Sequence, residues 1–285
     1  MNDHFPARPR TTSESTRVPG EYKKKQDVIE QQAPPIRRKT DTVSIFFVIK
    51  TVIRSAFYFI DTEIFMQKET KQGAAVYSPL VLKLYDCWVL GISNSFAWQC
   101  PTKKILLPFF KQHVGQRHLD VGVGTGYYLH NTHLPSKTHV TLMDLNPNSL
   151  AAANARLNRA STQLIQHDVM TALPTQLDGA FDSISLFYLL HCLPGTLKDK
   201  SIVFEHLKHH IKPDGVLYGA TILGDGANHN RFGQKLMTIY NKKGIFGNQH
   251  DNRETLEAEM SKHFADVRIT VCGKVALFEG RQSII

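Results

Sequence analysis

The sequence has few cysteines, and they lie far apart. Its 285 residues contain four, Cys87, Cys100, Cys192 and Cys272, and no two of them form a C-x-x-C pair. A disulfide framework needs a denser set of cysteines, and a zinc site needs ligands paired at short spacing. The cysteine pattern therefore argues against both and predicts an intracellular, cytoplasmic protein.

The sequence also lacks a secretory leader and an unbroken membrane-spanning run. Residues 1–42 hold few large apolar side chains and are predicted to form a disordered, basic N-terminal tail. The most hydrophobic segment, residues 43–65, is interrupted by Lys50 and Arg54, which a membrane span would have to bury. On a helix these charges share one side, so we predict an amphipathic helix. Two roles stay open for it: peripheral contact with a membrane, or packing on the domain that follows.

A strongly one-sided charge distribution is missing as well. The formal net charge is +9, of which +4 lies in residues 1–75 and +5 in the remainder. Nucleic-acid-binding domains gather basic residues into a patch or stripe, so a dispersed excess supports that class only weakly. With 42% apolar residues, the chain can build one domain with a substantial core. We place this domain in residues 66–285.

From about residue 77 onward, strand and helix patterns alternate. Apolar runs predict strands at 117–123, 138–145, 162–168, 181–190 and 215–223, and helices are predicted at 78–114, 148–160, 196–211 and 252–263. Such alternation indicates a mostly parallel sheet with helices on both faces. Residues 265–282 form two further strands joined at Cys272-Gly273-Lys274, and so tight a connection joins only antiparallel strands. The predicted fold is α/β, a Rossmann-like sheet of seven strands that ends in an antiparallel hairpin.

A glycine-rich turn follows the first predicted strand, in the stretch HLDVGVGTGYYL. Gly122 and Gly124 fit the dinucleotide pattern G-x-G-x-x-G, but the third glycine, Gly126, comes one residue early. Asp120 precedes the turn, where a carboxylate would repel a pyrophosphate but would suit an ammonium group. Glycines let a backbone approach a ligand closely, and a helix beginning near Gly126 would direct its N-terminus at a carboxylate. The turn thus favours a ligand with an amino-acid end; a tight turn without any ligand is the alternative.

Two more acidic residues end the next two predicted strands. Asp144 lies 24 residues after Asp120, where an acidic residue of a doubly wound sheet accepts hydrogen bonds from ribose hydroxyls. Asp168 follows the third strand and is suited to the exocyclic amine of an adenine; a helix cap or turn is its alternative role. Ligands of open α/β sheets bind beyond the carboxyl ends of the strands, where all three carboxylates are predicted to lie.

The motifs LDVGVGTG, MDLNPNSL, QHDV and FDSISLFYLLHCLP, in this order, resemble the class I S-adenosylmethionine-dependent methyltransferases over roughly residues 77–285. The segments FYLLHCLPG and YNKKGIFGNQHDN are similar to small bacterial and fungal members. The resemblance implies S-adenosylmethionine as the cofactor. It assigns the methionyl part to Asp120 and the backbone of Gly122, Gly124 and Gly126, the ribose to Asp144, and the adenine to Leu145, Asp168 and Val169. It further implies that Phe187 and Tyr188 line the methyl-transfer centre.

The loop after the fourth strand bears on the acceptor. Families that methylate exocyclic amines of nucleobases or glutamine carry Asn or Asp followed by Pro-Pro-aromatic there, and this chain does not. We therefore expect a small-molecule acceptor, with nucleic acid disfavoured and O-, N- or C-methylation undecided. His191 has a pKa suited to proton abstraction and joins Tyr188 as a candidate catalytic residue. Its alternative role is that of a structural histidine.

Other features are less specific. Tyr77, Tyr85, Trp88 and Trp98 form a lid or pack ordinary helices, and Asp86 caps a helix or contacts the cofactor. Asn241, Asn248 and His250 lie in a late loop of the kind that often binds ligands. No carboxylate pair has metal-ligand spacing, so we predict a metal-independent enzyme. Two alternatives stay open: an RNA or protein methyltransferase with a basic surface, and a membrane-tethered cofactor-binding protein without catalysis.

Overall fold

The computed structural model describes residues 86–284, so the predictions for residues 1–42, residues 43–65, Tyr77 and Tyr85 lie outside the described residues. Seven strands form one sheet in the order β3-β2-β1-β4-β5-β7-β6. The strands are β1 (Arg117–Val121), β2 (His139–Asp144), β3 (Thr162–Gln166), β4 (Phe181–Phe187), β5 (Ile211–Ile222), β6 (Phe264–Cys272) and β7 (Val275–Ser283). Strands β1 to β5 are parallel, and β7 is antiparallel to both β5 and β6. The predicted seven-stranded sheet and its C-terminal hairpin are confirmed.

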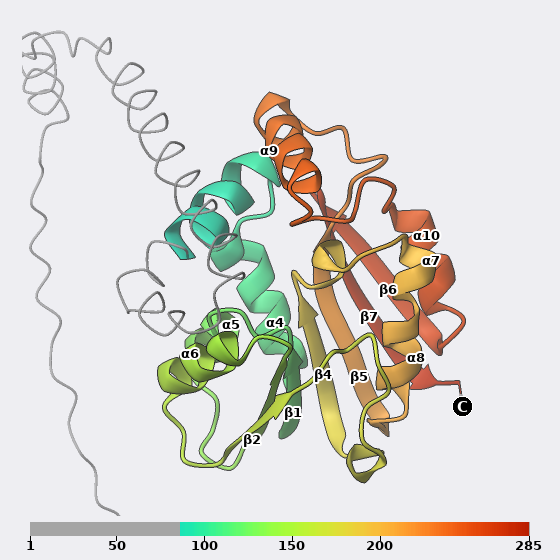
Figure 1. The fold of residues 1–285 in the computed structure, drawn as a ribbon. Coiled ribbons are helices and arrows are strands. Elements are labelled where there is room, and N and C mark those ends of the chain that lie inside the picture. Colours follow the sequence, from blue (N-terminus) through green and yellow to red (C-terminus); the bar gives the residue numbers. More distant parts are fainter. Residues whose placement is uncertain (1–85, 285) are drawn as a thin grey trace, which may run out of the picture. The chain divides into compact units, whose positions relative to one another are not determined.

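Helices cover both faces of this sheet (Figure 1). On one side lie α4 (Leu107–His113), α5 (Tyr127–Thr132) and α6 (Pro147–Leu157), and on the other lie α7 (Leu197–Lys200), α8 (Ile202–Lys208) and α10 (Arg253–Met260). At the carboxyl ends of the parallel strands, α9 (Arg231–Lys242) meets the π-helix η2 (Cys87–Ala97). The short helical turns η3 (Thr102–Leu106), η4 (Thr175–Leu177) and η5 (Leu190–Cys192) complete the described part. None of the described helices is long and apolar enough to cross a membrane.

The two faces of the sheet differ in chemistry because side chains alternate along a strand. Toward α8 and α10 the sheet presents aliphatic residues such as Leu119, Ile184 and Leu217, which pack on Phe204 in one hydrophobic core. Toward α4 and α5 it presents aromatic and polar residues instead: His118, Asp120, Ser183, Ser185, Phe187 and Tyr218. The ring of Phe110 from α4 packs against this second face. The polar residues of the functional site belong to it.

Several boundaries differ from the sequence-based expectations. The region predicted as one helix at 196–211 is divided into α7 and α8, and β5 begins at Ile211 rather than at 215. The helix α9 is not among the predicted elements, because Gly233 in its first turn and the glycines before it are typical of a loop. Gly233 is needed there: a Cβ at this position would lie 3.1 Å from the carbonyl oxygen of Ala97, so glycine lets α9 approach η2.

Candidate functional site

The glycine turn adopts the conformation that its residue types permit. Gly122, Gly124 and Gly126 all have positive φ, at 73°, 51° and 68°, which other residues adopt rarely. A Cβ at Gly126 would lie 3.0 Å from Ala153 of α6, so this glycine lets the turn and α6 pack closely. At Gly124, by contrast, an added Cβ would meet no atom within 4 Å. The turn is thus supported from behind and open in front, as a ligand cradle requires. The helix expected near Gly126 begins at Tyr127.

Asp120 is a buried carboxylate without a basic partner. Its side chain is 6% exposed, and no Lys or Arg of the described residues lies within ion-pair distance. One oxygen, Oδ1, accepts a hydrogen bond from the Ser185 hydroxyl. Burial, with a smaller contribution from Asp144, raises the pKa of Asp120 to about 7. A cation placed beside it would reverse this shift, so the residue suits the ammonium group of a methionyl ligand.

Asp144 is the last residue of β2, and Leu145 follows it, beside the glycine turn. The Asp144 carboxylate accepts the backbone N–H of Asn146 at 2.9 Å. Burial raises the pKa of Asp144, and the N–H groups of Asn146, Gly124 and Val123 oppose that rise. Leu145 is 62% exposed, which is unusual for a leucine and leaves an apolar surface directly after the carboxylate. These two residues present the surfaces that a ribose and an adenine need.

Asp168 already performs the local role that the sequence left open. Its Oδ1 accepts the backbone N–H of Met170 at 2.9 Å, and its carbonyl oxygen accepts the N–H of Thr171 at 2.9 Å. The carboxylate therefore stabilises the turn after β3. Its second oxygen, Oδ2, accepts no hydrogen bond from the described residues and is the atom available to a ligand amine. Val169 is buried next to it.

A polar network that the sequence did not predict fixes the glycine turn to η2. The hydroxyl of Thr125, inside the turn, donates to Asp86 Oδ1 at 2.7 Å, and Arg156 of α6 pairs with Oδ2 at 2.6 Å. Arg156 also donates to the carbonyl oxygen of Thr125 at 3.2 Å. The Asp86 side chain makes no capping hydrogen bond to η2 and holds the turn instead. The available signal was a threonine between two glycines, followed by an arginine on the next amphipathic helix.

Aromatic rings gather after β4, at the end of the sheet where the carboxylates lie. Phe187 is buried, with its ring centroid 4.7 Å from that of Tyr128. Tyr188 has a positive φ of 60°, an uncommon conformation that for a non-glycine residue often marks a functional position. Its hydroxyl is buried without a hydrogen-bond partner among the described residues. The ring of His191 stands between Tyr188 and Phe246, at centroid distances of 5.3 Å and 4.5 Å.

The contacts of His191 bear on its two candidate roles. Its Nδ1 accepts the backbone N–H of Ile222 at 3.3 Å, and the Thr221 hydroxyl lies 3.4 Å away. A backbone N–H can only donate, so Nδ1 carries no proton and the ring proton sits on Nε2. Burial, assisted by the charge of Lys200, lowers the pKa of His191 to about 3. These contacts favour the structural role over proton abstraction.

Buried hydrogen bonds to α7 and β5 hold the loop that contains Asn248 and Asp251. Lys200 of α7 is fully buried; its ammonium donates to Asp251 at 2.7 Å and to the Gly247 carbonyl at 2.8 Å. Asn248 is buried too and donates to the Ile222 carbonyl at 2.8 Å, which makes it part of the scaffold. Asn241 and His250, by contrast, line a cavity of about 290 Å³ beside Phe246.

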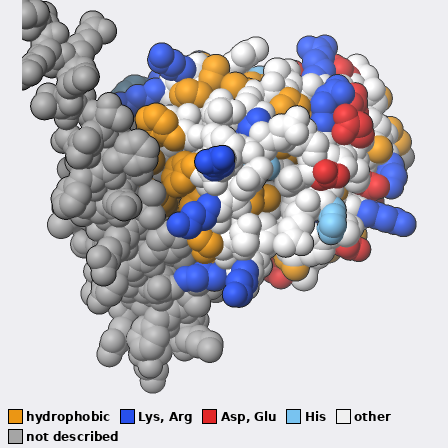
Figure 2. Space-filling view, turned by 90° about the horizontal axis from the view of Figure 1, so that it is seen from above, with side chains coloured by type: hydrophobic (Ala, Val, Ile, Leu, Met, Phe, Trp, Pro, Cys, Tyr) orange, Lys and Arg blue, Asp and Glu red, His pale blue; other side chains and the backbone are white. Residues whose placement is uncertain are grey.

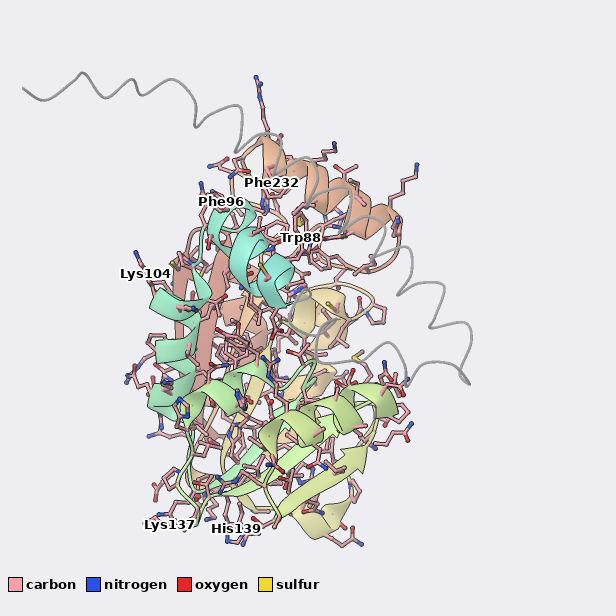
Figure 3. All side chains as sticks on the ribbon, turned by 90° about the vertical axis from the view of Figure 1, so that its left-hand side faces the viewer. Trp88, Phe96, Lys104, Lys137, His139 and Phe232 are labelled. Carbon is pink, nitrogen blue, oxygen red and sulfur yellow. The ribbon has the colours of Figure 1, made fainter. Side chains whose placement is uncertain are left out.

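Above the strand ends, η2 and α9 meet through aromatic side chains. The rings of Trp88 and Phe232 stand edge to face with their centroids 6.4 Å apart, at the upper end of the view in Figure 3. Trp98 is buried and packs edge to face on His229. Both tryptophans therefore take part in helix packing. The face seen from this end carries Lys and Arg side chains spread among hydrophobic and uncharged ones (Figure 2).

Comparison with known proteins agrees with this geometry. A family model described as a methyltransferase domain matches residues 119–217. The chain is 45% identical over 210 residues to the physcion biosynthesis cluster O-methyltransferase of Aspergillus chevalieri, covering 74% of this chain and 95% of the relative. It is 35% identical over 218 residues to demethylluteothin O-methyltransferase of Streptomyces thioluteus, covering 76% and 94%. The solved structure of an O-methyltransferase family protein from Burkholderia thailandensis shares the fold, with a TM-score of 0.54, 14% identity, and coverage of 81% of this chain and 71% of that one.

The glycine turn after β1, the carboxylates at the carboxyl ends of β1 to β3 and the parallel sheet with its terminal hairpin accord with these matches. Identities of this level over nearly the whole length of the relatives establish the family. The chain belongs to the class I S-adenosylmethionine-dependent methyltransferases and is an enzyme of that family.

Proposed function

We propose that this enzyme transfers the methyl group of S-adenosylmethionine to a small molecule, and that an oxygen of that molecule is the nucleophile. The observation that carries this proposal is the similarity, over 95% and 94% of their lengths, to two relatives named as O-methyltransferases. Both names refer to small molecules. The aromatic rings beyond β4 support the same reading, because apolar walls with few polar groups are typical of small-molecule sites.

We assign the cofactor to the carboxyl ends of β1, β2 and β3. Asp120 would bind the ammonium group, and Gly122, Gly124 and Gly126 would hold the methionyl part through their backbone. Asp144 would accept the ribose hydroxyls. Leu145, Asp168 and Val169 would contact the adenine, and Phe187 would close the site. The bound cofactor supplies an electrophilic methyl group on a sulfonium, so the protein's own task is alignment of the acceptor.

Tyr188 and His191 are proposed to shape the acceptor side of this centre. The unpartnered hydroxyl of Tyr188 is the polar atom suited to orienting an acceptor oxygen. His191 supports the Tyr188 ring through their edge-to-face contact and keeps its proton on Nε2. In this assignment neither residue is a general base, so the acceptor must itself be acidic enough to lose its proton to water. Phenolic and enolic hydroxyls meet that condition better than aliphatic alcohols.

The decisive experiment incubates the full chain with isotopically labelled S-adenosylmethionine and a panel of phenols, enols, amines, RNA and peptides. Label is expected in phenolic or enolic oxygens. Transfer only to RNA or peptides would replace the proposal by the macromolecular alternative. Replacement of Asp144 by Ala is expected to weaken S-adenosylhomocysteine binding about a hundredfold, since two hydrogen bonds to a charged group are lost. Unchanged binding would refute the cofactor assignment.

His191→Gln separates the two roles of the histidine. Loss of a general base lowers kcat by about 10²–10⁴-fold, whereas loss of a packing contact is expected to lower it less than tenfold. We expect the smaller effect. Peripheral membrane contact through residues 43–65 stays a prediction from the sequence, because this segment lies outside the described residues.

A further inference from the structure

A line of buried polar side chains leads along the centre of the sheet to Asp120. His118 and Asp120 share one face of β1, and Ser183 and Ser185 share the matching face of β4. The register pairs His118 with Ser183 and Asp120 with Ser185. All four side chains are buried. Central strands of a parallel sheet ordinarily carry apolar residues at such positions, so four polar ones in a row call for a cause.

These groups form a continuous series of hydrogen bonds. The backbone N–H of Gly115 donates to Ser183 Oγ at 2.7 Å, and Ser183 Oγ lies 2.7 Å from Nδ1 of His118. On the other side of the ring, Nε2 lies 3.1 Å from Ser185 Oγ. Ser185 Oγ then donates to Oδ1 of Asp120. The series therefore begins at a backbone amide and ends at the carboxylate of the cofactor site.

With Asp120 ionised, the state that receives a cation, one arrangement of protons satisfies the whole series. Asp120 accepts, so Ser185 must donate its proton to it and must accept from His118 Nε2–H. His118 Nδ1 then accepts from the hydroxyl of Ser183, whose oxygen is left to accept the N–H of Gly115. Each hydroxyl donates once and accepts once, and His118 is neutral. Burial lowers the pKa of His118 to about 3, which agrees with a neutral ring.

We propose that His118 is a positioning residue that acts through Ser185 to hold the Asp120 carboxylate in the orientation that receives the ammonium group of S-adenosylmethionine. This inference rests on the proposed cofactor role of Asp120. The fixed proton on Nε2 ensures that the Ser185 hydroxyl points at Asp120 and not back at the ring. Oδ1 of Asp120 is thereby occupied, which leaves Oδ2 for the ligand. Hydrogen bonds aligned in one direction also strengthen one another.

Other ionisable groups face Asp120, and none of them should be substituted when its titration is tested. Asp144 faces it from β2, Tyr128 from α5 and Tyr218 from β5. Burial raises the pKa of both tyrosines well above its usual value, so they stay neutral near pH 7. Burial raises the pKa of Asp144 as well, several backbone N–H groups oppose that rise, and Asp144 is unchanged in every variant of the test. Asp120 is therefore the group expected to control the pH dependence of cofactor binding around neutrality.

The test measures S-adenosylhomocysteine binding by calorimetry on the full chain from about pH 6 to pH 8.5. Binding to the unaltered protein should strengthen with pH, with a midpoint near the Asp120 pKa of about 7. In Ser185→Ala the carboxylate loses its donor, so the midpoint should rise by about one pH unit and binding at pH 7 should weaken about fivefold. His118→Leu should show the same change to a smaller extent, about twofold at pH 7.

Rescue variants distinguish positioning from mere packing. Ser185→Thr keeps the hydroxyl, and His118→Gln keeps a donor directed at Ser185, so both should restore the original midpoint. Thr141→Val removes a buried hydroxyl from the opposite face of β2 and should leave the midpoint unchanged even if it lowers the melting temperature. Thermal melting of each variant without ligand identifies any that fail to fold. In that case the comparison rests on Ser185→Thr and His118→Gln.

The outcomes separate this inference from the function on which it rests. If Asp120→Asn abolishes the pH dependence while Ser185→Ala and His118→Leu keep the original midpoint and affinity, the positioning role of His118 and Ser185 is refuted. The cofactor role of Asp120 then stands. If Asp120→Asn binds S-adenosylhomocysteine as tightly as the unaltered protein at every pH, the cofactor role of Asp120 is refuted. The positioning role of His118 and the cofactor role of Asp120 are both supported if the midpoint pH is highest in Ser185→Ala, lower in His118→Leu and unchanged in the rescue variants.

Discussion

Two buried carboxylates in this enzyme have opposite surroundings. Asp251, 1% exposed, meets the ammonium of Lys200 at 2.7 Å, and neither group reaches solvent. Asp120, 6% exposed, has hydrogen bonding from Ser185 but no cation among the described residues. Burial raises the pKa of both carboxyls, and Lys200 opposes that rise only at Asp251.

The difference separates an acid that the fold pairs from one that the fold leaves without a cation. A buried charge is stable only when it is paired, and the fold supplies the pair for Asp251. For Asp120 the fold supplies orientation alone, and in the assignment proposed above the countercharge comes from the cofactor. Two equally buried carboxylates thus differ in whether the fold itself supplies the cation.

The largest expected effect is at the paired site. Lys200→Met leaves Asp251 buried without a countercharge and should lower the free energy of unfolding by about 3–5 kcal/mol, measured by urea denaturation. Adding Asp251→Leu should recover most of that loss. The matched control is Lys262→Met, which breaks the half-exposed pair with Glu259 and should cost less than about 1 kcal/mol. Equal losses from both lysine variants would contradict the contrast.

A smaller effect of opposite sign is expected at Asp120. Burial raises its pKa from 3.8 in the unfolded chain to about 7 in the folded protein, so its stabilising contribution is present below about pH 4 and is lost as pH rises to about 7. In Asp120→Asn the side chain has no charge to bury, so the free energy of unfolding does not fall in this way as pH rises. At about pH 8 and without ligand, the free energy of unfolding of the variant should therefore be about 1–2 kcal/mol higher than that of the unaltered protein. S-adenosylhomocysteine should bind to the variant about thirtyfold more weakly.

Thermal and urea unfolding of the free proteins at about pH 5 and pH 8 check the stability change, and calorimetry checks the binding. The two proteins should differ less at the lower pH, because Asp120 is then protonated in the folded state. A variant that is destabilised at both pH values would show that Asp120 is held for structure, like Asp251.

The smallest effect is expected at Asp86, which is buried but whose ion-pair partner Arg156 keeps 20% of its side chain exposed. Asp86→Asn keeps an acceptor for Thr125 and loses only the ion pair. Calorimetry should show S-adenosylhomocysteine binding about two- to threefold weaker, since the glycine turn is less firmly held. Breaking the exposed helix pair with Glu257→Gln, beside Arg253, should change neither binding nor stability measurably. A loss above tenfold in Asp86→Asn would indicate direct contact with the cofactor.

The sheet could be predicted because its signals are local. Turn residues separate each apolar run from the next, and Cys272-Gly273-Lys274 is too short to join parallel strands. The carboxylates Asp120, Asp144 and Asp168 follow from the same logic, since the end of a strand fixes the edge of the sheet at which a residue lies. Gly233, in contrast, made α9 look like a loop, because the contact that requires this glycine is with distant Ala97.

The networks around the site could not be predicted, because they depend on pairings between distant segments. Lys200 and Asp251 are separated by 51 residues, and nothing local marks either as buried. The alternation of His118 with Asp120 and of Ser183 with Ser185 is visible in the sequence. Its meaning depends on the register between β1 and β4, which only the structure gives. The two candidate roles of His191 could not be weighed from the sequence for a related reason, because the N–H that its Nδ1 accepts comes from Ile222 on a separate strand.

The hairpin also determines when the sheet can be completed during synthesis. β7 (Val275–Ser283) lies between β5 and β6, although it is made after both. Until those residues have left the ribosome, β5 has an open edge and β6 has no neighbour to join. Open edges recruit other strands, so the nascent chain passes through an interval in which it is most exposed to aggregation and most dependent on chaperones. Completion of the sheet thus depends on the synthesis of β7, although β7 lies inside the sheet and not at its edge.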